Sequence, residues 1–111
     1  MEYKIKSRIW IEIDGKIFLG EGRIKLLKAI QNTGSLSKAA RALDMSYKKA
    51  WNLIDSVNKA SEQAVVIKNT GGKGGGGAEV TSYGCDLIDS FDRINKNCWK
   101  FLDKQTLVNF P

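Results

Sequence analysis

The 111-residue sequence contains no histidine, which removes the side chain that most often serves as a general base or zinc ligand. Its two cysteines, Cys85 and Cys98, lie 13 positions apart on one expected helix, too far for a mutual disulfide, and their spacing matches no metal site. We therefore expect no enzymatic activity, no cofactor and no metal. Reduced thiols of this kind are typical of a cytoplasmic protein.

The sequence also lacks a long apolar run. No segment approaches the roughly 18 apolar residues that cross a membrane, and the N-terminus has no signal-peptide core. A chain of 111 residues is the size of one domain with a modest core, which an oligomeric partner would enlarge. We expect a single domain over residues 1–111 with no membrane partner.

The net charge of +6 is concentrated in the middle of the chain. Residues 23–73 hold ten of the 18 Lys and Arg residues but three of the 12 Asp and Glu residues. A basic block inside a patterned, foldable segment favours a nucleic-acid partner over a solvated tail.

Residues 1–19 are predicted to form a β-hairpin. Apolar and polar residues alternate from Ile5 to Ile13, which is the period of a strand. Asp14-Gly15 can supply the two positive φ angles of a type I′ turn, and residues 16–19 return. A two-stranded ribbon is marginal alone, so it must pack on its own helices or on a partner chain, and the sequence leaves both open.

Three helices are predicted next, at about residues 22–32, 36–43 and 47–59. Thr33-Gly34 ends the first in a left-handed conformation, and Ser35 and Ser46 are good N-caps for the other two. The apolar face of the first helix is formed mostly by Ile24, Leu27, Ala29 and Ile30.

The second and third helices have the spacing of a helix-turn-helix. The positions that require small or apolar residues are occupied by Ala39, Ala40, Leu43, Met45, Ala50 and Leu53. Ala40 must be small because the two helices cross there. Asp44 replaces the usual turn glycine, and aspartate tolerates the left-handed conformation better than most residues. The alternative is a helical hairpin in an unrelated core.

In a helix-turn-helix the N-terminal turn of the third helix enters the major groove. The candidate DNA contacts are Ser35, Ser37, Lys38, Arg41, Ser46, Tyr47, Lys48, Lys49 and Asn52. Lys48 and Lys49 are the strongest candidates, whereas Ser35 and Ser46 act first as caps and Tyr47 fits the core and DNA equally. Trp51, Ile54 and Val57 are expected in the core, since they follow one another at spacings of three.

Residues 65–68 and 78–81 are predicted to be the strands of a wing. Between them six glycines surround Lys73 at residues 71–77, so the tip would offer positive charge and bare backbone N–H groups. We expect Lys68, Thr70 and Lys73 to touch the phosphate backbone, a contact that positions a protein without specifying sequence.

The glycine run also suggests three other interpretations. A Walker A loop fails because Ile67 occupies its first glycine position and Gly74 follows Lys73. Residues 72–77 match G-x-G-x-x-G, but a strand-like segment follows where a dinucleotide site needs a helix. A flexible loop without a role is the third interpretation.

The last helix is predicted from Tyr83 to Lys104, capped by Thr81 or Ser82. Leu87, Phe91, Ile94, Cys98 and Phe101 follow at spacings of 4, 3, 4 and 3, a heptad seam that Ile88 widens. We expect this seam to form a homodimer interface, and the alternative is packing on its own domain. The expected architecture is mainly α with small β: a hairpin (residues 1–19), a winged helix-turn-helix (22–81) and a long dimerisation helix (82–104).

Three motifs carry a family resemblance: G-S-L-S-K-A-A at 34–40, M-S-Y-K-K-A-W at 45–51 and T-G-G-K-G-G-G-G-A at 70–78, followed by Val80-Thr81 and Tyr83-Gly84. They resemble the N-terminal domain of ModE, the molybdate-responsive bacterial transcription regulator, itself similar to the winged helix-turn-helix of LysR-type regulators. The resemblance implies a dimer through the last helix, residues 46–49 at the DNA and Lys73 in the wing.

ModE regulators continue into small β-barrel domains that bind molybdate, whereas this sequence stops at Pro111. We therefore expect a stand-alone form without a molybdate sensor that binds an inverted-repeat operator in double-stranded DNA as a homodimer. A separate effector or sensor protein would be a further partner. The alternative function is a dimeric adaptor that uses the winged fold to associate with such a sensor.

Overall fold

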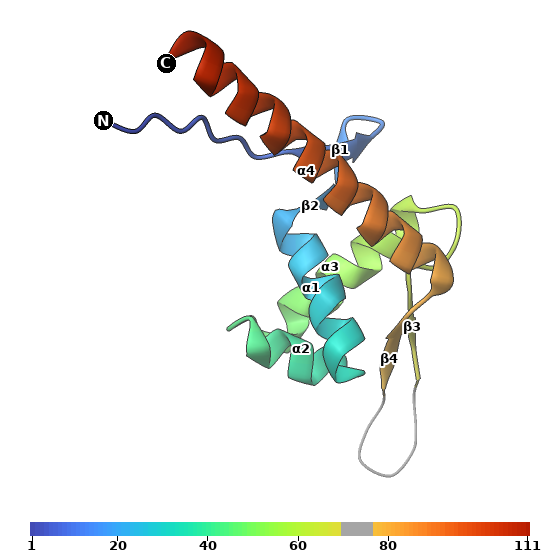
Figure 1. Ribbon diagram of the computed structural model, residues 1–111. Coiled ribbons are helices and arrows are strands. Elements are labelled where there is room, and N and C mark those ends of the chain that lie inside the picture. The colour runs from blue at the N-terminus through green and yellow to red at the C-terminus, as the bar shows by residue number, and fades with distance from the viewer. Residues whose placement is uncertain (70–76) are drawn as a thin grey trace.

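The computed structural model describes residues 1–69 and 77–111. Figure 1 shows a helical body from which a β-ribbon and a long helix project. In chain order the elements are β1 (Trp10–Ile13), β2 (Lys16–Gly20), α1 (Glu21–Thr33), α2 (Leu36–Ala42), α3 (Tyr47–Ala60), β3 (Val66–Lys68), β4 (Ala78–Val80) and α4 (Ser82–Asn109). None of the helices in this described part is long and apolar enough to cross a membrane.

The body is a winged helix. α1, α2 and α3 pack on one another, and β3 pairs antiparallel with β4 to form the base of the wing. β4 also contacts α1, because the Ala78 amide donates to the Gly34 carbonyl at the end of that helix (3.0 Å). The expected mainly α architecture with a small hairpin and a long last helix is confirmed. Residues 70–76, the greater part of the predicted glycine tip, lie outside the described residues.

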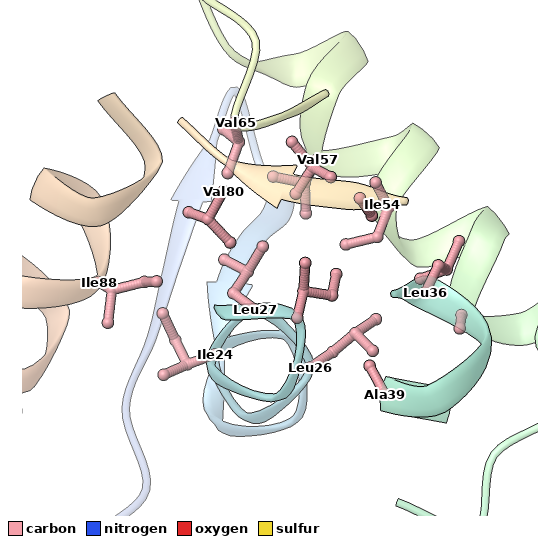
Figure 2. Packing of buried hydrophobic residues seen from close by; sticks show 14 of the residues in the cluster. Ile24, Leu26, Leu27, Leu36, Ala39, Ile54, Val57, Val65, Val80 and Ile88 are labelled. Atoms are coloured by element: carbon pink, nitrogen blue, oxygen red, sulfur yellow. The ribbon is translucent and has the colours of Figure 1, made fainter. Parts of the chain in front are cut away.

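The core lies between α1 and the elements around it, as Figure 2 shows. Leu26, Leu27 and Ile30 of α1 are completely or almost completely buried, and Ile54 and Val57 of α3 pack against them. Leu26 was not in the predicted apolar face, so the buried stripe of α1 is wider than the periodicity indicated. Ala40 is buried where α2 crosses its neighbours, as its small size predicts.

Local signals in the sequence predicted the ends of α1, α2 and α3 correctly. Gly34 has φ 67° after α1, and Asp44 has φ 52° in the turn between α2 and α3. The Ser35 and Ser46 hydroxyls accept hydrogen bonds from the Lys38 and Lys49 amides, as N-caps do. The bounds of α1, α2 and α3 differ from the predicted ones by one residue at most at each end.

The N-terminal hairpin is shorter than predicted. Asp14 (φ 51°) and Gly15 (φ 80°) form the expected turn, but β1 begins at Trp10 instead of near Ile5. The reason is that β2 ends at Gly20, the partner of Trp10, and α1 begins at once, so the preceding residues have no strand to pair with. They run as an extended segment, residues 1–9, called here the N-terminal segment.

The N-terminal segment lies along α4 of its own chain (Figure 1). Lys4 forms an ion pair with Asp103, the Ser7 hydroxyl lies 3.4 Å from the Cys98 thiol, and the Tyr3 ring stacks on Phe110. The alternation in the sequence corresponds to an alternation in burial, because Ile5, Ser7 and Ile9 are half-buried and the residues between them are exposed. Side chains of α4, and not a second strand, cover this segment.

The last helix is longer than predicted at its C-terminus. Thr81 is its N-cap, accepting from the Gly84 amide at 3.0 Å, and α4 runs 28 residues to Asn109. Nothing between Lys104 and Pro111 breaks a helix, so the predicted end at Lys104 was too early. The first half of α4 packs on the body through Ile88 and Phe91, and the second half extends beyond α1–α3 (Figure 1).

Candidate nucleic-acid interface

The N-terminal turn of α3 is exposed and basic. It begins where the left-handed Asp44 turns the chain out of α2 and where Ser46 caps the helix. Tyr47 is 55% exposed, so it belongs to the surface and not to the core. Lys48, Lys49 and, one turn later, Asn52 are also exposed. The helix-turn-helix therefore presents these predicted contacts together on one outward surface.

A shallow groove runs beside this turn. It is lined by Ser46, Lys48, Lys49, Asn52, Arg23, Leu53 and Ser56. The first four of these are predicted site residues, and the other three, Arg23, Leu53 and Ser56, were not predicted as site residues. The Ser46 oxygen accepts the capping hydrogen bond, which leaves its hydroxyl proton able to donate to a ligand on the surface.

The predicted contacts on α2 form a second group. Ser35 is half-buried and is occupied as the N-cap, in agreement with its expected first role. Ser37, Lys38 and Arg41 are exposed, and the Arg41 guanidinium donates to the Ser37 hydroxyl at 3.4 Å. Ser37 and Arg41 lie one helical turn apart, and their side chains are in contact.

The basic side chains of these two groups are not neutralised. Lys25 and Lys59 each pair with a carboxylate four residues away on their own helix, and Lys28 pairs with Asp92 of α4. Among residues 1–69 and 77–111, by contrast, no salt bridge involves Lys38, Arg41, Lys48 or Lys49. Their charge is available to an anionic partner.

Trp51 is not in the core, so that prediction was wrong, whereas Ile54 and Val57 are buried as expected. The inward face of α3 is centred on Ala50, Ile54 and Val57. A step of three residues falls about 60° short of a full helical turn, which moves Trp51 to the edge of that face. Trp51 is 39% exposed, and the Lys68 ammonium lies over its ring, 4.1 Å from the ring centroid.

The base of the wing lies beside α3. Lys68 at the end of β3 is half-buried, and its ammonium lies over the Trp51 ring. Of the other predicted wing contacts, Thr70 and Lys73 lie outside the described residues. The structure therefore places one of the three predicted wing residues, Lys68, and this residue lies next to α3.

No family model matches the sequence. The sequence is 46% identical over 84 residues to the transcriptional regulator ModE of Yersinia pestis, and 45% identical over 84 residues to the DNA-binding transcriptional dual regulator ModE of Escherichia coli K12. Both alignments cover 76% of this chain and 32% of the relative. The ModE regulator of Haemophilus influenzae is 37% identical over 86 residues, 78% of this chain and 34% of that protein. The chain is a relative of the ModE regulators.

The resemblance inferred from the three motifs is thus confirmed by relatives that carry the ModE name. The chain spans about a third of the length of these curated ModE proteins. The similarity therefore bears on about a third of each relative and not on the rest of its length.

Two residues that join the parts of this ModE-related domain were not predicted. The Asn58 side chain donates to the Val66 carbonyl (2.9 Å) and accepts from the Val65 (2.8 Å) and Val66 (3.1 Å) amides, which ties β3 to α3. Arg23 donates to the Ile17 and Phe18 carbonyls (3.0 and 3.2 Å). In sequence both look like ordinary exposed polar residues of a helix, so no pattern distinguished them.

The predicted dimer residues of α4 fall into two sets. Ile88 and Phe91 are buried in the core of their own chain, and Leu87 is half-buried against it. Ile94 is 49% and Phe101 60% exposed, whereas Cys98 is half-buried against the N-terminal segment. Part of the predicted seam is therefore used within the chain, and part of it faces outward.

Proposed function

We propose that the chain is a DNA-binding transcription regulator that places the N-terminal turn of α3 in the major groove. The observation that carries this proposal is the exposed turn with Tyr47, Lys48 and Lys49, presented by a packed helix-turn-helix without carboxylate partners for its lysines in the described chain. The names of the ModE relatives, which describe transcriptional regulators, support it.

The candidate residues divide between sequence reading and positioning. Lys48 and Asn52 lie one turn apart on the outward face of α3, and lysine and asparagine side chains suit the base edges of guanine and adenine. Ser37, Lys38 and Arg41 on α2 would hold the phosphate backbone, which fixes orientation. Lys68 would contact the backbone from the wing, and Thr70 and Lys73 remain proposed contacts of the same kind.

We also propose that the regulator is a homodimer joined through α4. Residues 87, 94, 101 and 108 repeat every seven positions, and Ile94, Phe101 and Val108 of this stripe are exposed apolar side chains. Apolar residues at this period pair helices of two chains. Ile88 and Phe91, buried in their own core, would support the helix without touching the partner.

In such a dimer a two-fold axis would relate two α3 helices. Placed about 34 Å apart, one turn of the duplex, they would match an inverted-repeat operator. The domain would work in the cytoplasm, where DNA is available, and a separate effector or sensor protein could act on the same dimer.

Selection of binding sites from a random duplex library at two salt concentrations tests this function. Enrichment of an inverted repeat, with affinity that falls with salt by about 0.9 in log K per log salt for each neutralised phosphate, is the expected result. A dimer that enriches no sequence and binds duplex only weakly would contradict the proposal and favour the adaptor function.

A further inference from the structure

The contact between α3 and the wing passes through Trp51 and Lys68. Resting on the proposed function, we infer that Trp51 is a positioning residue, which holds the Lys68 ammonium against the recognition helix so that it meets the phosphate backbone beside the helix. Two observations on the side chains carry this: the Lys68 Nζ lies 4.1 Å from the centre of the indole ring, and Trp51 is 39% exposed outside the buried core.

A cation over an indole face is attracted by the quadrupole of the ring. An ammonium on a four-carbon stem samples many rotamers in water, and ordering it at an interface costs entropy. A ring that already restricts Lys68 lowers that cost, so the same ammonium binds phosphate more tightly. Trp51 therefore acts on DNA through Lys68 and needs no DNA contact itself.

The backbone on both sides of this contact is held in place. Asn58 binds the amides of Val65 and Val66 and the carbonyl of Val66, two residues before Lys68. On the other side of β3, Lys68 pairs in register with Ala78, whose amide is bonded to Gly34 at the end of α1. The main chain at Lys68 and the Trp51 ring are both held against α3. The side chain of Lys68 is therefore the part that can still move, and the ring restricts its rotamers.

Two other roles for Trp51 make different predictions. If the indole touched DNA directly, its removal would weaken binding whether or not Lys68 were present. If Trp51 only stabilised the fold, its removal would lower the unfolding temperature. The loss of DNA affinity in each Trp51 variant would then follow the loss of stability. A double-mutant cycle separates these roles.

The experiment measures duplex affinity and its salt dependence for the full chain, for Trp51→Leu, for Lys68→Met and for the double variant, with thermal unfolding of each. Trp51→Leu should weaken binding about two- to fivefold, the range of an exposed cation–π contact, without lowering the unfolding temperature. Lys68→Met should weaken binding at least as much and lower the salt slope by about 0.9. The double variant should bind like Lys68→Met, and Trp51→Phe should restore most of the affinity.

Losses that multiply in the double variant would overturn the inference in favour of a direct DNA contact by Trp51. Unchanged binding by Trp51→Leu, or a loss that follows a lowered unfolding temperature, would also overturn it. If Lys68→Met left affinity and slope unchanged while Lys48→Ala still weakened binding, the inference would fail and the α3 contact of the proposed function would stand. A wild-type chain that bound no duplex would instead remove the proposed function.

Discussion

A Cβ atom on Gly84 would lie 2.5 Å from the Val65 carbonyl oxygen and 2.7 Å from the Val80 Cγ1. The first turn of α4 thus crosses the base of the wing at a distance that only glycine permits. This contact sets where α4 leaves the body, and with it the direction of the proposed dimerisation helix.

Gly84→Ala should therefore destabilise the domain. The added methyl meets a backbone oxygen that cannot swing aside, so we expect a loss of roughly 1–3 kcal/mol in the free energy of unfolding, although alanine is the better helix former. Chemical denaturation measures it. Gly22→Ala is the matched control, because a Cβ there meets nothing within 4 Å, and its stability should stay the same or rise. Equal stability of both variants would contradict the close crossing.

Asn58→Ala should loosen the wing from α3. It removes the three hydrogen bonds to residues 65 and 66 and leaves part-buried backbone groups without partners, at a cost of roughly 1–3 kcal/mol. Hydrogen exchange at the Val65 and Val66 amides should accelerate more than exchange in the centre of α1. Asn52→Ala, on the exposed face of the same helix, should change neither quantity. Unchanged exchange at residues 65 and 66 in Asn58→Ala would show that the asparagine does not anchor the strand.

Phe101→Asp should disrupt self-association while the domain stays folded. Phe101 is 60% exposed in the seven-residue stripe of α4, so a charge there costs the monomer little but places an unpaired carboxylate in the proposed interface. We expect the dimer dissociation constant to rise at least about thirtyfold, as for a hot-spot residue. Sedimentation equilibrium measures this constant.

The control for that experiment is Leu107→Asp, since Leu107 is also exposed on α4 but lies off the stripe. It should dimerise like the wild type. If Phe101→Asp and the wild type had the same mass in solution, the stripe would not be the interface.

The features that the sequence predicted well are local. The turn at Asp14-Gly15, the caps Ser35 and Ser46 and the left-handed Asp44 each depend on a few neighbouring residues, and the structure has all of them. Motif spacing likewise located the exposed basic turn of α3, because a helix-turn-helix fixes which of its positions face inward.

The features that the sequence did not predict depend on distant partners. Trp51 has the spacing of a core residue, and its place under Lys68 follows only from how the wing lies on α3. The N-terminal segment alternates like a strand, but α4, about 90 residues away in sequence, covers it instead of a second strand. Asn58 has three backbone partners that no helical pattern records.

The central claim is that the N-terminal turn of α3 binds DNA, and the most direct test compares two double variants in duplex binding across a range of salt. One is Lys48→Ala with Lys49→Ala. The other is Lys96→Ala with Lys100→Ala, which removes the same charge from exposed positions of α4, a helix that packs on α1 and β4. The account predicts that the α3 variant loses at least about tenfold in affinity, and about 0.9 in salt slope for each phosphate contact removed, while the α4 variant binds nearly as the wild type does. Equal affinities and slopes for the two variants would contradict it.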